Sequence, residues 1–218
     1  MIDHDDHQHA NKADLSHHFD TSRLEAFSDG VFAIAITLLI IEVGVPHITA
    51  GESLAHALWQ QWPSYFGFAL SFVAIGIMWM NHHAMFRDIE RVDQTVLVLN
   101  ILLLMAVSFL PFPTAVLADY LRDGNSRLAA TLLYGGTLVT TAVWFNALWL
   151  YASIGRRLID EHVSDRRIQQ RTWRFLLGPA VYGLSLILAF VSPWISLWLY
   201  VGLALLYFLP ISETDASS

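Results

Sequence analysis

The segment from Arg23 to Val43, RLEAFSDGVFAIAITLLIIEV, constrains this chain most. It begins with polar and charged residues and turns into a long apolar run that only Thr37 interrupts. Charged and polar groups are expensive in a lipid bilayer, so those at the start of an apolar helix need partners. The segment therefore predicts a membrane helix with a built polar site at its mouth.

The composition indicates an integral membrane protein. Of the 218 residues, 55% are hydrophobic and 14% are charged, whereas soluble domains carry about 25% charged residues. The eight Trp residues suit the membrane interface. The absence of Cys excludes disulfides and thiolate metal sites, and a net charge of −7 argues against nucleic acid as a partner. We expect no cofactor. We also expect no cleaved signal peptide, because a polar, acidic tail precedes the first apolar run.

The apolar segments predict an all-α membrane protein with six transmembrane helices per subunit. Each predicted span has about 20 mainly apolar residues, as a helix needs to cross the bilayer. The six cover residues 24–45, 62–80, 95–117, 128–151, 173–191 and 194–209. Pro111 and Pro113 are expected to kink or end the third helix, and Gly178-Pro179 to kink the fifth. The alternative is four spans with two buried segments that do not cross.

The basic residues predict the orientation and the domain limits. With the N-terminus inside, all but Arg122 and Arg127 of the 12 Lys and Arg residues fall on the inner side, which places both termini in the cytoplasm. We expect a disordered, acidic and His-rich tail over residues 1–22, a transmembrane domain over 23–211 and a solvated tail over 212–218. Nothing in the N-terminal tail would pre-organise a metal site.

On a helical wheel the first helix has two different flanks. Its stripe is apolar except for one hydroxyl and consists of Phe27, Gly30, Ile34, Thr37, Leu38 and Ile41. Asp29 and Glu25 lie on another flank, with Ser28 beside them. Periodicity alone leaves open whether the stripe faces lipid, the bundle core or a pore.

The second helix offers partners for the polar flank at its inner end, in the segment MWMNHHAMF. These candidates are Trp79, Asn81, His82 and His83. A Trp or His N–H is expected to donate to Asp29 or Ser28, and Arg23 to pair with a carboxylate. Such a network would have a structural role, which is to fix how the helices pack. One alternative is proton sensing by a histidine. The other is metal ligation, for which adjacent histidines are poorly spaced.

The segment R-L-E-A-F-S-D-G-V-x-A-I-x-I-T, followed by W-M-N-H-H-x-M-F, resembles the transmembrane protein 175 family of potassium channels. The resemblance is narrower to its bacterial members with a single repeat. The Arg23, Phe27, Ser28 and Asp29 pattern carries it, and the motifs cover two helices. The chain also lacks the TVGYG filter segment of ordinary potassium channels.

This resemblance implies a homotetramer in the cell membrane that conducts K⁺ passively and is not an enzyme. The first helix of each subunit would line the central pore, with a hydrophobic gate or constriction formed by Ile34, Leu38 and Ile41 and a polar ring at Thr37. The implied structural network consists of Arg23, Phe27, Ser28, Asp29, Trp79, Asn81, His82 and His83. One rival is a proton-coupled secondary transporter that uses Asp29 with His82 or His83; another is a membrane enzyme with a metal at the same residues.

Overall fold

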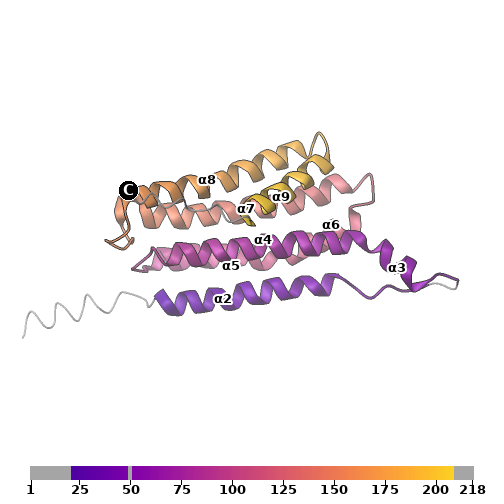
Figure 1. Ribbon diagram of the computed structural model, residues 1–218, viewed down its shortest axis with the longest axis horizontal. Coiled ribbons are helices and arrows are strands. Elements are labelled where there is room, and N and C mark those ends of the chain that lie inside the picture. The colour runs from indigo at the N-terminus through magenta and orange to yellow at the C-terminus, as the bar shows by residue number, and fades with distance from the viewer. Residues whose placement is uncertain (1–20, 49–50, 209–218) are drawn as a thin grey trace, which may run out of the picture.

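The computed structural model describes residues 21–48 and 51–208, which form an elongated helical bundle (Figure 1). Its elements are α2 (Thr21–Leu38), η1 (Leu39–Glu42), α3 (Leu54–Gln60), α4 (Trp62–Phe86), α5 (Gln94–Phe109), α6 (Pro111–Tyr120), α7 (Arg127–Ser153), η2 (Ile154–Arg156), α8 (Asp165–Leu188) and α9 (Pro193–Phe208). The predicted tails over 1–20 and 212–218 lie outside the described residues. The last two residues of the predicted N-terminal tail, Thr21 and Ser22, belong to α2.

Short polar residues and prolines set the helix ends. The Asp93 carboxylate caps α5 by accepting the Val96 N–H at 3.0 Å, and the Ser164 hydroxyl caps α8. Pro111 opens α6, where its missing N–H costs no helical hydrogen bond. The span Gln94–Tyr120 is therefore interrupted next to Pro111, as the sequence predicts.

Four helical segments of the described chain are long and apolar enough to cross a membrane, and the prediction of six spans is wrong. They are Thr21–Glu42, Trp62–Phe86, Gln94–Tyr120 and Arg127–Arg156. The first ten residues of α8, DRRIQQRTWR, are almost entirely polar or charged. The apolar run over 173–191 therefore makes up only part of this helix. With 16 residues, α9 extends only about 24 Å, against a hydrocarbon core of about 30 Å. The placement of both termini in the cytoplasm stays a prediction.

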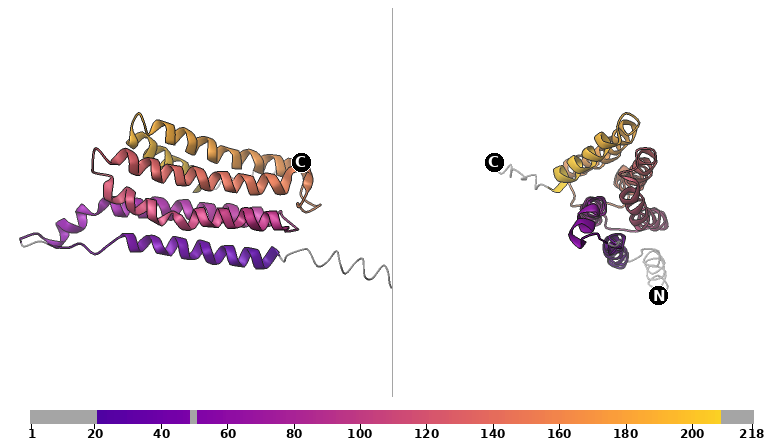
Figure 2. Two further views of the ribbon diagram at one scale, coloured as in Figure 1. Left: turned by 180° about the vertical axis from the view of Figure 1, so that it is seen from behind. Right: turned by 90° about the vertical axis from the view of Figure 1, so that its right-hand side faces the viewer.

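The first helix lies at the edge of the bundle, as the end-on view shows (Figure 2). It packs against α4 and α5, whereas α7 packs against α5, α6 and α8, and α9 fills the space beside α8 and α4. Only 22% of the apolar window of Thr21–Glu42 is buried, compared with 44% to 50% in the other three candidate spans. One face of α2 is therefore left without a partner among residues 21–48 and 51–208.

Pro179 lies inside the continuous helix α8, and a neighbouring helix satisfies the carbonyl that it leaves without a donor. Because proline has no N–H, the Phe175 carbonyl four residues earlier lacks its helical donor. The Asn146 side-chain amide on α7 donates to this carbonyl at 2.9 Å, and the Tyr207 hydroxyl on α9 donates to the Arg174 carbonyl at 2.9 Å. The Asn146 side chain thus replaces the hydrogen bond that Pro179 removes, as apolar surroundings require.

Candidate pore-lining helix and its polar contacts

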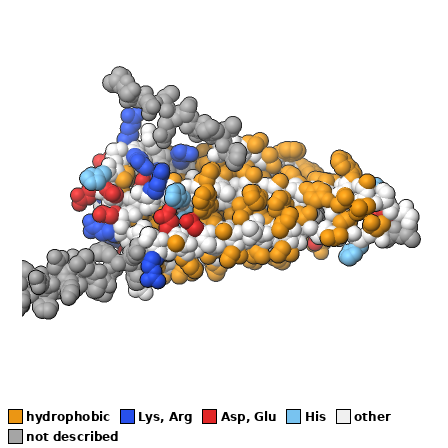
Figure 3. All heavy atoms as spheres, turned by 60° about the horizontal axis from the view of Figure 1, so that its bottom comes forward, with side chains coloured by type: hydrophobic (Ala, Val, Ile, Leu, Met, Phe, Trp, Pro, Cys, Tyr) orange, Lys and Arg blue, Asp and Glu red, His pale blue; other side chains and the backbone are white. Residues whose placement is uncertain are grey.

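The apolar stripe predicted on the first helix is the face of α2 that the other described helices leave exposed. Phe27, Ile34, Leu38 and Ile41 are each between 41% and 68% exposed. Figure 3 views the bundle from the side on which α2 lies and shows hydrophobic side chains along most of its length, with charged side chains mainly at one end. A long apolar surface of this kind indicates contact with lipid or with another protein surface.

Thr37 is the one polar side chain on this stripe, and its proton is used within the helix. The hydroxyl donates to the carbonyls of Ala33 and Ile34, each at 2.9 Å. A hydroxyl that donates inward leaves its oxygen lone pairs free. Thr37 therefore presents an acceptor, suited to a cation or to water, on an otherwise apolar face.

The opposite side of α2 is held by a buried chain of hydrogen bonds that crosses three helices. Ser28 Oγ donates to the Leu24 carbonyl at 2.8 Å and accepts from Asn100 Nδ2 of α5 at 2.9 Å. The Asn100 Oδ1 atom lies 2.9 Å from Nε2 of His82 on α4. Ser28, Asn100 and His82 are fully buried, so this chain fixes the position of α2 where water cannot replace it.

Two further contacts join α2 to α4 beside this chain of hydrogen bonds. Trp79 Nε1 donates to Asp29 Oδ1 at 2.8 Å, as the sequence predicts for a Trp N–H. His83 Nδ1 lies 2.6 Å from Glu25 Oε1, and the rings of Trp79 and His83 stack with centroids 6.2 Å apart. Both pairs are partly open to solvent, so each holds the helices together less strongly than the buried chain.

The structure brings together most, but not all, of the predicted network. The side chains of Arg23 and Phe27 are exposed, and Arg23 forms no hydrogen bond or ion pair with residues 21–48 or 51–208. Asn81 points to a different side of α4, where it lines a cavity. Asn100 belongs to the network but was not among the predicted residues. Its lone amide within the apolar run LVLNILLL was a usable signal, because such a group needs partners in the membrane.

A second polar cluster, also missed, lies at the charged end of the bundle. The Asp88 carboxylate is 1% exposed and forms ion pairs with Arg167 at 3.0 Å and with Arg171 at 2.6 Å. Arg171 also donates to the Ala84 carbonyl. The backbone N–H of Asp160 donates to the Asp88 carbonyl at 3.0 Å. Together these contacts tie the end of α4 to the start of α8.

The described residues hold no group of three or more His, Asp or Glu side chains placed to bind a metal ion. The metal-enzyme alternative therefore gains no support from residues 21–48 and 51–208.

We expect Asp29→Ala to lower the stability of the folded protein by about 1 kcal/mol, because it leaves the Trp79 N–H without its acceptor. Asp29→Asn is the matched control, since its amide oxygen still accepts from Trp79. Thermal denaturation in detergent should show a lower midpoint for the Ala variant than for the Asn variant. Equal midpoints would remove Asp29 from the network.

Comparison with known proteins places this arrangement in a family. The family model described as endosomal/lysosomal potassium channel TMEM175 matches residues 23–111, which contain α2, α4, α5 and their polar contacts. A potassium channel from Streptomyces collinus is 45% identical over 188 residues, 86% of this chain and 91% of the relative. The vertebrate endosomal/lysosomal proton channel TMEM175 of Gallus gallus is 31% identical over 147 residues, 62% of this chain and 29% of that protein.

A solved structure has the same architecture. The crystal structure of a lysosomal potassium-selective channel TMEM175 homolog from Chamaesiphon minutus superposes with a TM-score of 0.78 at 40% sequence identity, covering 86% of this chain and 95% of that one. The present chain aligns with 91% of the Streptomyces relative and 95% of the Chamaesiphon chain. The residues that the family model covers include those that form the polar contacts of α2. The chain belongs to the TMEM175 family.

Proposed function

We propose that this protein is a potassium-selective channel of the cell membrane that conducts K⁺ passively along its electrochemical gradient. Its family, and the relatives named potassium channels, support this function. The observation that carries it is the uncovered stripe of α2: an apolar face with a single hydroxyl, on a helix whose opposite side is fixed by buried hydrogen bonds. An ion channel needs such a helix, because its pore surface must be held in register by the rest of the fold.

The stripe requires other copies of the chain to form a pore. We infer a homotetramer with the four α2 helices around the central axis, so that the stripe of each subunit faces the axis. Subunits arranged in a closed ring use two different surfaces for each contact. The other flanks of α2, and the helices behind them, would supply these surfaces.

In this assembly Ile34, Leu38 and Ile41 form apolar rings, and Thr37 forms a ring of hydroxyl oxygens. A narrow apolar ring excludes water and so blocks ions, and conduction requires the rings to widen. A permeating ion then sheds part of its hydration shell beside Thr37. K⁺ holds its water less tightly than Na⁺, which favours K⁺ at such a site.

A flux assay on purified protein in liposomes tests the function. We expect K⁺ to move down its gradient with no saturation at high K⁺, faster than Na⁺, and without a need for a proton gradient. A proton-coupled transporter that uses Asp29 with His82 or His83 would instead show saturable K⁺ movement driven by a pH difference. Flux that requires the pH difference would overturn the proposal, as would equal rates in protein-free liposomes.

A further inference from the structure

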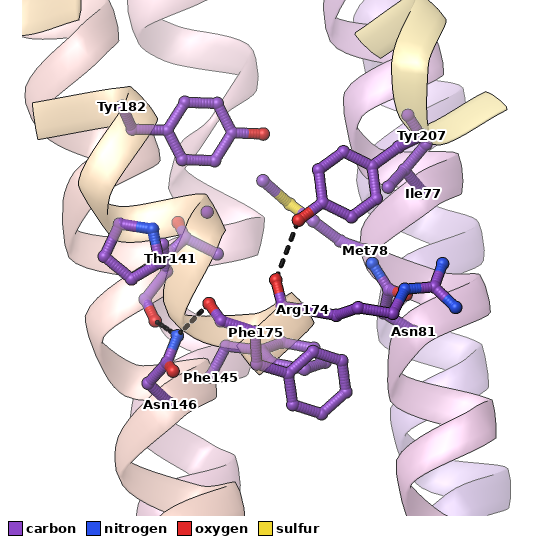
Figure 4. Close-up of a pocket in the computed structure, with 13 residues that line it drawn as sticks. Ile77, Met78, Asn81, Thr141, Phe145, Asn146, Arg174, Phe175, Tyr182 and Tyr207 are labelled. Atoms are coloured by element: carbon purple, nitrogen blue, oxygen red, sulfur yellow. Dashed lines mark hydrogen bonds between the residues drawn. The ribbon is translucent and has the colours of Figure 1, made fainter. Parts of the chain in front are cut away.

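A cavity of about 60 Å³ lies apart from α2, lined by residues of α4, α7, α8 and α9 and open on one side (Figure 4). Its walls are mainly apolar, including Ile77, Met78 and Phe145. Arg174 on its rim is the tenth residue of α8, which puts the cavity about 15 Å from the charged end of the bundle. A volume of this size admits roughly four water-sized groups.

Several polar atoms around this cavity have no hydrogen-bond partner in the part of the chain that the structure describes. Asn146 is 7% exposed; its Nδ2 donates to the carbonyls of Ala142 and Phe175, while its buried Oδ1 has no hydrogen bond within the described chain. The Tyr182 hydroxyl and the Asn81 amide also form no hydrogen bond with residues 21–48 or 51–208, and Figure 4 shows the Tyr182 hydroxyl directed toward the space between α8 and α4. A buried acceptor without a donor is costly, so the cavity suits a ligand that donates to Asn146.

The rim of the cavity carries an uncompensated positive charge. Arg167 and Arg171 share the Asp88 carboxylate, whereas Arg174 has no carboxylate partner among the described residues. Burial lowers the pKa of Arg171, and although Asp88 opposes this shift, the charges of Arg167, Arg87 and Arg174 add to it. This corner of the bundle therefore holds more positive than negative charge and favours an anion.

We propose that the cavity binds the head group of an anionic membrane phospholipid, one that carries a hydroxyl as well as a phosphate. The phosphate pairs with the Arg174 guanidinium, and the hydroxyl enters the cavity and donates to Asn146 Oδ1. The acyl chains remain outside, on the exposed apolar surface of α8 that Leu176 and Leu177 provide. Arginine suits this role because its fork of donors matches phosphate oxygens.

The test measures binding, so its outcome is independent of ion flux. The full-length protein in an uncharged maltoside detergent is heated with short-chain phosphatidylglycerol, whose head group has both required groups. A ligand that binds only the folded protein raises the denaturation midpoint, and we expect a rise of about 5 °C at saturation. Short-chain phosphatidylcholine, laurate and glycerol phosphate without acyl chains should each give less than half of this rise.

Two arginines on the same helix provide a matched pair of variants. Arg174→Gln should abolish the rise, whereas Arg166→Gln, the same change at an exposed residue that does not line the cavity, should keep it. Asn81 lines the same cavity from α4, beside the Arg174 side chain in Figure 4, so Asn81→Leu should reduce the rise and gives a second test if Arg174→Gln does not fold. A full rise in both Arg174→Gln and Asn81→Leu, or equal loss in Arg166→Gln, would overturn the proposal, as would a full rise with phosphatidylcholine or glycerol phosphate.

Discussion

In liposomes, Ile34→Asn is expected to conduct K⁺ about tenfold faster than the unsubstituted protein, which corresponds to a barrier lower by about 1.4 kcal/mol. Ile34 is 61% exposed on the uncovered stripe of α2. In the proposed tetramer four isoleucines meet at this level and exclude water. Four amide side chains hydrogen-bond water and keep the constriction wet, so ions pass more often. The initial rate of K⁺ efflux from loaded liposomes measures this change.

The same substitution at Ile101 is the matched control. Ile101 is 57% exposed, but it lies on α5, away from the stripe. Ile101→Asn should leave K⁺ efflux unchanged once equal amounts of folded protein have been reconstituted. If Ile34→Asn leaves the flux unchanged, or if Ile101→Asn raises it equally, then Ile34 does not lie at the constriction.

Replacing Asp88 by Asn is expected to destabilise the protein by about 3 kcal/mol, the largest stability effect that we foresee. The carboxylate is fully buried between two guanidinium groups, and Asn has the same shape but no charge. Arg167 is half exposed and can turn toward water, whereas Arg171 is only 15% exposed and would keep a buried charge without its partner. Thermal denaturation in detergent should show a fall in the midpoint of several degrees.

Asp165→Asn is the control for this prediction. Asp165 also pairs with an arginine, Arg156, at 2.6 Å, but its side chain is 88% exposed. When such an exposed pair is broken, water solvates the charge that remains. The loss of stability should therefore stay below about 1 kcal/mol. Similar shifts for Asp88→Asn and Asp165→Asn would show that burial does not set the strength of the Asp88 cluster.

The sequence predicted the organisation of α2 well because a helical wheel depends only on local geometry. The stripe through Ile34 and Leu38 and the flank with Ser28 and Asp29 face different surroundings, and Asp29 meets Trp79 on the neighbouring helix. Because α2 and α4 are consecutive long helices that run antiparallel, the start of α2 meets the end of α4, which made the partner of Asp29 predictable.

Contacts between helices that are distant in the sequence could not be predicted in this way. Asn100 meets Ser28 and His82, and Asp88 meets Arg171, only because the rotation of each helix about its axis is fixed by the whole bundle. The prediction of the number of spans was wrong for a different reason. Apolar runs within α8 and α9 indicated two more crossings, but the structure shows that α8 begins with a charged segment and that α9 is short.

Modification of a single cysteine tests the central claim, that the stripe of α2 faces the ion path, most directly. The chain has no Cys, so Thr37→Cys introduces a unique thiol on the stripe and Val98→Cys a unique thiol on the exposed side of α5. A charged, membrane-impermeant methanethiosulfonate reagent attacks only a thiolate, which forms where water reaches the sulfur. We expect this reagent to abolish most K⁺ flux through Thr37→Cys and to leave Val98→Cys unaffected. Unchanged flux through a Thr37→Cys channel that is shown to be labelled would contradict the account.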